Sequence, residues 1–159
     1  MTEENYNQCV RDLSQKVYLF ILNQIKDSQA AQDIVQDSFL LLWEKRKEID
    51  KGKAQGFVFK VAYHKMIDSI RYNKRFTLPS QTKEPQTQIM YSDAKDVITK
   101  VLDTLPEAQR AIILLRDNEG YSYKEIAQML NLSPEKVQVY LYRERVLIKK
   151  VILRQENII

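Results

Sequence analysis

The first half of the chain carries three stretches in which apolar residues recur every three or four positions. One runs from about Tyr6 to Lys26, the second is "KDSQAAQDIVQDSFLLLWEKRKEI" with Asp27 or Ser28 as its N-cap, and the third is "FVFKVAYHKMIDSIRYNKR". Such spacing is typical of helices with one buried face. The pattern therefore predicts three helices, with inward positions Val10, Leu13, Val17, Phe20, Ile21 and Ile25, then Ala31, Ile34, Val35, Phe39, Leu42 and Trp43, then Val58, Val61, Ala62, Met66 and Ile70.

Two segments interrupt this pattern. "DKGKAQG", between the second and third helices, holds two glycines among lysines and is predicted to be an exposed loop. "FTLPSQTKEPQTQIMYSD", after the third helix, has two prolines among Ser, Thr and Gln and shows no sustained period. This composition is typical of a flexible tether. We therefore predict a first domain over residues 1–75, a linker over 76–92 and a second domain over 93–159.

The second half resumes the helical pattern near residues 93–105, and another helix is expected from Pro106 to near Asp117. Ser122 with Glu125 three residues later forms a capping box before "YKEIAQML". "NLS" then makes a short turn before the last helix, so the chain ends in a helix-turn-helix hairpin. The predicted fold is all-α: two small helical domains joined by a flexible tether, the second ending in a helix-turn-helix.

Composition narrows the classes of function that the protein can have. The 159 residues carry a net charge of +4 with pI near 9.0, which suits a nucleic-acid partner without requiring one. No run of about eighteen apolar residues occurs, and the first residues, "MTEENYNQCVRDL", are polar and acidic. We therefore expect a cytoplasmic protein with no membrane insertion.

The sequence offers little for catalysis. Cys9 and His64 are the only residues of their kinds, so no cluster has metal-ligand spacing. No motif places a nucleophile or carboxylate beside His64, and there is no glycine-rich phosphate loop. We expect no enzyme, no metal and no cofactor.

Three surfaces are candidates for binding. Cations on the third helix and its preceding loop alternate with aromatic residues, a combination that suits single-stranded DNA, although a solvated helix face over core aromatics would look the same. In the hairpin, Val137 and Leu141 can seat the last helix and leave its other face free for a DNA groove, although small hairpins often only pack. The outer edge of the second helix is acidic and rich in amides, which indicates either a solvated edge or a protein partner.

Taken together, these motifs resemble the small two-domain bacterial sigma factors of the extracytoplasmic-function group across nearly the whole chain. "AAQDIVQDSFLLLW" is similar to the second-region motif, and "FVFKVAYHKMIDSIR" is similar to the promoter-melting helix. "LDTLPEAQRAIILLRDNEGYSYKEIAQMLNLS" is similar to the fourth region almost throughout.

The resemblance implies a division of labour between the domains. The second helix would dock on core RNA polymerase, the third would hold the melted minus-ten strand with a flipped base, and the last would read the minus-thirty-five element in the major groove. It also implies an inhibitory anti-sigma partner that covers one or both domains. The implied residues are Gln32, Asp33, Gln36 and Asp37 for polymerase; Lys53, Lys60, Tyr63, His64, Lys65 and Arg71 for the minus-ten element; and Arg116, Lys136, Gln138, Val139, Tyr142, Arg143 and Arg145 for the minus-thirty-five element.

The chain departs from the family pattern at both DNA-facing helices. Phe57 stands where a tryptophan is usual and His64 where an asparagine is usual, and "QVY" replaces the usual basic-Ser-Arg run of the reading helix. Gln138 can make a bidentate contact to adenine and Val139 can contact a thymine methyl. We expect an upstream element richer in A and T than the usual target.

Two other functions compete with a promoter-specificity subunit. A sigma mimic would bind an anti-sigma factor without contacting promoters, but the cations kept on both predicted DNA faces favour the sigma factor. An ordinary hairpin repressor would explain neither the first half of the chain nor the tether.

Overall fold

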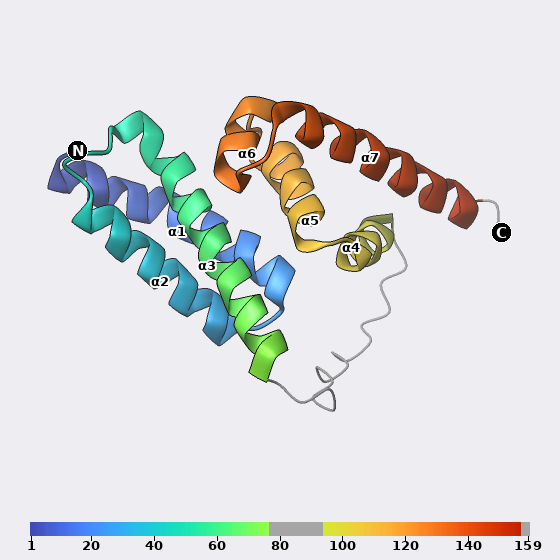
Figure 1. Cartoon of the computed structure of the whole chain (residues 1–159), viewed down its shortest axis with the longest axis horizontal. Coiled ribbons are helices and arrows are strands. Elements are labelled where there is room, and N and C mark those ends of the chain that lie inside the picture. The colour runs from blue at the N-terminus through green and yellow to red at the C-terminus, as the bar shows by residue number, and fades with distance from the viewer. Residues whose placement is uncertain (77–93, 157–159) are drawn as a thin grey trace.

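The computed structural model describes residues 1–76 and 94–156, and all regular structure in these ranges is helical. The first half is a bundle of α1 (Glu3–Ile25), α2 (Ser28–Glu44) and α3 (Ala54–Phe76), with a 3-10 turn, η1 (Lys51–Lys53), before α3 (Figure 1). The second half contains α4 (Ala94–Thr104), α5 (Glu107–Ile113), a π-helical turn η2 (Leu114–Asn118), α6 (Tyr123–Leu130) and α7 (Pro134–Glu156). The all-α prediction is confirmed, whereas the predicted tether falls almost wholly outside the described residues.

Local capping explains where the first two helices begin. The Thr2 hydroxyl accepts from the backbone N–H of Asn5 at 3.1 Å, and the Asp27 carboxylate accepts from that of Ala30 at 3.1 Å. Lys26, with φ of 58°, turns the chain between the two helices. Each cap satisfies an N–H that has no partner inside its helix.

The second helix ends earlier than predicted. It stops at Glu44, whereas the sequence pattern extended to Ile49. The Arg46 side chain turns back, with its guanidinium 3.7 Å from the centre of the Trp43 ring and a hydrogen bond of 2.8 Å to the Trp43 carbonyl. The terminal ammonium of Met1 donates to the carbonyl of Arg46 at 2.9 Å. These contacts take the place of helical hydrogen bonds, and Ile49 beyond them still packs against the hydrophobic cluster.

The predicted exposed loop before α3 is shorter than expected. Residues 50–56 were predicted to be a loop, but Lys51–Lys53 form η1 and α3 already begins at Ala54. Ala54 and Val58 are fully buried, so packing of their side chains fixes this turn against the bundle. The two glycines do not prevent helix formation, because tertiary burial outweighs their weak propensity.

The hairpin forms as predicted. The Ser122 hydroxyl accepts from the Glu125 N–H, and the Glu125 carboxylate accepts from the Ser122 N–H, each at 3.1 Å. Asn131, with φ of 58°, ends α6 in the left-handed conformation that Asn tolerates. Gly120, with φ of 74°, ends η2, so the chain can turn into the hairpin.

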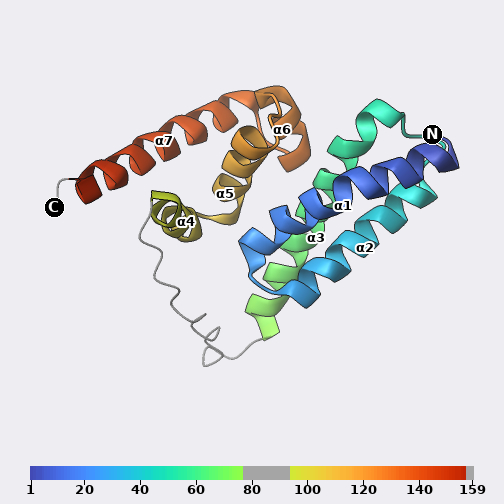
Figure 2. The ribbon, with the colours of Figure 1, turned by 180° about the vertical axis from the view of Figure 1, so that it is seen from behind.

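The two halves lie side by side and touch where α3 meets α6 (Figures 1 and 2). Buried residues of both halves form one hydrophobic cluster that includes Phe59 and Tyr63 of α3 and Ile126 and Met129 of α6. The long helix α7 extends away from this contact. None of the helices in the described ranges has the length and apolar content to cross a membrane.

Candidate nucleic-acid interface

The outer edge of α2 presents the four residues expected to meet polymerase. Gln32, Asp33, Gln36 and Asp37 are all exposed, while Ile34 on the opposite face is buried. Their spacing of three and four residues explains why one packing face leaves them together on the other side. The structure thus brings together the predicted acidic and amide side chains.

Leu40 was missed by the sequence analysis. Its side chain is 55% exposed, and it lies on the face of Gln36 and Asp37, four and three residues earlier. The signal was present in "FLLLW", because three consecutive leucines cannot all face the same side of a helix. We call the exposed set Gln32, Asp33, Gln36, Asp37 and Leu40 the α2 surface.

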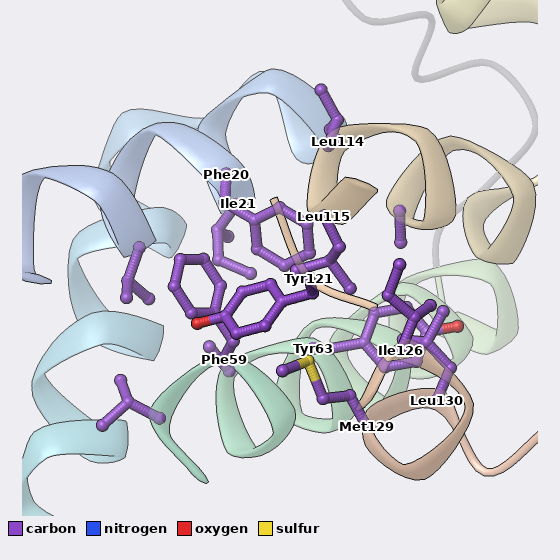
Figure 3. Packing of buried hydrophobic residues seen from close by; sticks show 14 of the residues in the cluster. Phe20, Ile21, Phe59, Tyr63, Leu114, Leu115, Tyr121, Ile126, Met129 and Leu130 are labelled. Atoms are coloured by element: carbon purple, nitrogen blue, oxygen red, sulfur yellow. The ribbon is translucent and has the colours of Figure 1, made fainter. Parts of the chain in front are cut away.

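The predicted minus-ten residues divide between the surface and the interior. Lys53, Lys60 and Arg71 are exposed, and His64 and Lys65 are half-buried. Tyr63, in contrast, is only 6% exposed, so its ring is not offered to solvent in this structure. Tyr63 lies one turn after Phe59 on the face of α3 that packs against the second half, where both rings join the shared hydrophobic cluster (Figure 3). Burial also raises the pKa of the Tyr63 hydroxyl, which keeps it neutral.

A shallow depression lies at the far end of α3. It has a volume of about 620 Å³ and is lined by Asp68, Arg71, Tyr72 and Lys74. Tyr72 is among the exposed large apolar residues of the chain. An aromatic face between two cations is suited to a nucleotide, because the ring can stack on a base while the cations meet phosphates. Tyr72 is not among the residues that the sequence predicted for the minus-ten element.

The last helix presents to solvent a face that carries both polar and apolar side chains. Val137 and Leu141 are buried against the rest of the hairpin, as predicted. Tyr142 is 72% exposed, and the remaining predicted residues of this face are exposed as well: Lys136, Gln138, Val139 and Arg143. The Ser133 hydroxyl accepts from the Lys136 N–H at 3.1 Å and fixes the start of the helix. The helix can therefore offer these side chains to a groove without unpacking.

Two of the predicted DNA-contacting arginines have partners within the protein. Arg116 donates to the carbonyl of Tyr121 at 2.8 Å, and its guanidinium lies 5.0 Å from the centre of the Tyr123 ring. Arg145 forms an ion pair of 3.1 Å with Asp117. These contacts join η2 to the hairpin and to α7. In this structure both arginines hold the second domain together, and Arg143 is better placed for a phosphate.

Glu144 is the unexpected residue of α7. Its side chain is 2% exposed, and neither carboxylate oxygen has a hydrogen-bond partner among the described residues. Burial, and secondarily the negative charge of Asp117, raises the pKa of Glu144 to about 8. A buried charge without a partner is strongly unfavourable, so the side chain is held as a neutral acid.

The described residues contain no group of three His, Cys, Asp or Glu side chains that could hold a metal ion. Cys9 is a buried free thiol, and burial raises its pKa. It packs in the hydrophobic cluster of the bundle.

Comparison with known proteins identifies both halves of the chain. Residues 9–76 match the family model for Sigma-70 region 2, and residues 95–148 match that for Sigma-70, region 4, so the two ranges together cover most of the chain. The chain is 26% identical to the ECF RNA polymerase sigma factor SigM of Bacillus subtilis, with 98% of this chain and 97% of that protein aligned. It is 25% identical to the ECF RNA polymerase sigma factor SigX of the same organism, over 97% of this chain and 88% of the relative.

A solved structure has the same fold. The sigma factor RpoE, solved in complex with the anti-sigma factor NepR from Bartonella quintana, aligns with a TM-score of 0.75 at 18% identity, covering 94% of this chain and 97% of that one.

Proposed function

Because this chain belongs to the extracytoplasmic-function group of the sigma-70 family, we propose that it binds core RNA polymerase and directs it to specific promoters for transcription initiation. It recognises and melts the minus-ten element with the first domain and reads the minus-thirty-five element with the second. It acts in the cytoplasm and catalyses no reaction itself. Its domains correspond to residues 1–75 and 93–159, with 76–92 as the linker.

The α2 surface is the proposed polymerase contact. Four polar side chains, with acidic groups at Asp33 and Asp37, lie along one face of α2, and the exposed side chain of Leu40 follows one turn later on the same face. Apolar side chains beside polar ones are the usual anatomy of a protein interface. The acidic groups would supply specificity and orientation, and Leu40 would supply buried apolar area.

The basic face of α3 is the proposed site for the melted minus-ten strand. Lys53, Lys60 and Arg71 are exposed for phosphates, and Tyr72 offers an aromatic face in the depression beside Arg71. His64 and Lys65 complete the surface. Because extruding a base loses a few kcal/mol of stacking, the strand needs both the cations and the ring to hold it.

The exposed face of α7 is the proposed reader of the minus-thirty-five element. Gln138 would donate to and accept from one adenine, and Val139 would contact a thymine methyl. Lys136 and Arg143 would contact phosphates and set the position of the helix in the groove. The upstream element should accordingly be rich in A and T.

An anti-sigma factor is the proposed regulator. The RpoE chain of the same fold was solved bound to such an inhibitor. A protein inhibitor that covered the α2 surface or the exposed face of α7 would block polymerase or promoter binding.

The observation that carries the proposal is that both matched regions keep most of their expected contact side chains exposed, on α2, α3 and α7. The test is capture of core RNA polymerase by this protein, followed by transcription from a pool of random promoter DNA and sequencing of the transcripts. We expect transcripts that share two upstream elements at fixed spacing. Capture without promoter choice, or no capture, would contradict the proposal.

A matched pair of variants makes this test specific to the α2 surface. D33A/D37A removes two acidic groups from that surface and should reduce capture of polymerase. E3A/E4A removes two equally charged and exposed groups from the start of α1 and should leave capture unchanged. Equal loss in both variants would mean that overall charge, and not this surface, governs binding.

A further inference from the structure

The last helix continues beyond the residues that match Sigma-70, region 4. That match ends at residue 148, whereas α7 runs to Glu156. Of the eight large apolar side chains that are exposed in the described residues, five lie on α7: Val139, Tyr142, Val146, Leu147 and Leu153. Three exposed cations follow the matched range: Lys149, Lys150 and Arg154. The solvent-facing side of α7 therefore extends well past the residues proposed to read DNA.

Two rows of side chains run along this side of the helix. Residues seven positions apart on an α-helix differ in direction by only about 20°. One row is formed by cations and the other by apolar residues, and all six side chains are exposed: Lys136, Arg143 and Lys150, and beside them Val139, Val146 and Leu153. The proposed function places the first two cations against phosphates. The same row continues at the same interval to Lys150.

Lys149 and Arg154 widen this cationic side of the helix. Lys149 lies three residues after Val146 and Lys150 lies four, so the two lysines stand on opposite sides of the apolar row. Arg154 follows Lys150 by one turn. None of the three cations after residue 148 forms an ion pair with a described carboxylate, whereas Arg145 is paired at 3.1 Å. Their charges are therefore available to an anionic ligand.

The second half of α7 is supported by protein and is not a free end. α4 packs against α7, and Val101 of α4 is only 8% exposed (Figure 1). Ile148 packs against the hydrophobic cluster, and Val151 and Ile152 are half-buried. Because α4 and the hairpin pack on the same helix, the cation row keeps its direction relative to the residues proposed to read bases.

The turns of α7 that are proposed to read bases carry no charge of their own. Between Lys136 and Arg143 the sequence is "VQVYLY". Contacts from Gln138 and Val139 to base edges supply specificity, whereas phosphate contacts supply a large share of the affinity and set the position of the helix. A helix that reads bases with uncharged side chains therefore needs phosphate contacts from elsewhere on the same rigid unit.

The dimensions of DNA place the added cations at the edge of the groove. At 1.5 Å per residue, Lys150 lies roughly 18 Å along the helix from Gln138. The major groove is about 12 Å wide and turns around the duplex, and an α-helix does not turn with it. A helix whose first turns lie in the groove therefore leaves it in its second half, where it passes over the bordering phosphates.

We propose that Lys149, Lys150 and Arg154 form a phosphate clamp, which extends the DNA contact of α7 beyond its base-reading turns. The inference rests on the proposed function, since it assumes that the start of α7 enters the major groove. The clamp binds the sugar–phosphate backbone on one flank of the upstream element, whatever the base sequence there. An acidic helix of a partner protein would fit the same two rows, but the continuity of the cation row with the cations beside the reading residues favours DNA.

The salt dependence of DNA binding measures the clamp directly. Fluorescence anisotropy with the full-length protein uses a duplex that carries the minus-thirty-five element from the transcript selection, with about ten base pairs, one helical turn, on each flank. K149Q/K150Q/R154Q should lower the log–log slope of affinity against salt by roughly 2 to 3, because each lost phosphate contact contributes about 0.9. Affinity at about 0.1 M salt should fall about tenfold or more.

The matched control removes the same charge from another part of the protein. K45Q/K47Q/K100Q replaces three exposed cations that lie off α7, and should leave the slope unchanged. All six positions are exposed, and Gln is a good helix former, so both triple variants should fold like the wild type. An equal fall in slope for both variants would mean that overall charge governs binding, and would overturn the clamp.

Duplex length locates the contacts. Trimming one flank of the duplex to the edge of the element should weaken binding of the wild type, and trimming the other flank should not. The K149Q/K150Q/R154Q variant should bind the trimmed and the full duplex equally. If the wild type and this variant respond identically to trimming, or share the same salt slope, the clamp is wrong and the two rows are left for an acidic protein partner.

A scrambled duplex separates this proposal from the proposed function. Loss of the clamp should weaken binding to the element and to the scrambled duplex by the same factor, because phosphates carry no sequence. A wild-type protein without preference for any element would contradict the proposed function, while the salt slopes on the scrambled duplex still decide whether the clamp exists. Preference for the element with no effect of the triple substitution would uphold the proposed function and reject the clamp.

Discussion

Glu144 offers a direct test of the electrostatics beneath the reading helix. Its carboxylate is buried in the second half, close to Asp117, and has no hydrogen-bond partner among the described residues. Replacing it by Gln keeps the size and shape of the neutral acid but removes the possibility of a charge. The variant should therefore be more stable than the wild type wherever the unfolded chain carries an ionised Glu144.

The magnitude follows from the raised pKa. Folding shifts the pKa of Glu144 from 4.5 to about 8, so between these values the folded protein must take up a proton that the unfolded chain has released. The wild-type protein consequently loses stability as the pH rises from near 4.5 toward 8. At pH 7 this penalty on the free energy of unfolding is about 3 kcal/mol, and at pH 5 it is about 1 kcal/mol.

Urea unfolding followed by circular dichroism measures both quantities. Glu144→Gln should raise the free energy of unfolding by about 3 kcal/mol at pH 7 and by about 1 kcal/mol at pH 5. Glu135→Gln, an exposed position at the start of the same helix, makes the same change in charge and should shift stability by no more than about 0.5 kcal/mol. A gain for Glu144→Gln that does not depend on pH, or a loss at pH 7, would refute the reasoning.

Three further outcomes are expected. Arg143→Ala should reduce the salt dependence of upstream DNA binding, lowering the log–log slope by about 0.9, because one phosphate contact is lost; Arg145→Ala, whose guanidinium is already paired, should change that slope less. Leu40→Asp should weaken binding to core polymerase about tenfold in a titration, since it replaces the exposed apolar side chain of the α2 surface, whereas Leu153→Asp, also exposed but on α7, should not. Ser122→Ala should lower the free energy of unfolding by about 1 kcal/mol in urea, because the capping box of α6 is removed; an unchanged urea midpoint would show that the cap is replaced by water.

Local features of the sequence predicted the elements and many of the exposed side chains. Helical periodicity identified Val17 and Ile21 as core, and the Ser-x-x-Glu spacing identified the cap of α6, because both signals depend on neighbours within a few residues. The early end of α2 was missed because part of its cause lies far away in the sequence. Met1 and the turned-back Arg46 compete for backbone groups that a helix would otherwise use.

The buried state of Glu144 was missed for a similar reason. In the sequence it stands between two arginines on a charged helix, which indicates a solvated face. Its position one turn after Tyr140 and three residues after the buried Leu141 places it on the inner side once α7 packs against the rest of the second half. Helical periodicity alone could have indicated that Glu144 faces inward. That its carboxylate has no hydrogen-bond partner among the described residues is visible only in the three-dimensional structure.

Tyr63 shows why a binding surface predicted from residue types alone must be checked against the tertiary structure. An aromatic ring among lysines satisfies both the chemistry of base stacking and that of an apolar contact, and the sequence cannot distinguish them. In this structure the Tyr63 ring is buried in the hydrophobic cluster that it shares with residues of the second half of the chain.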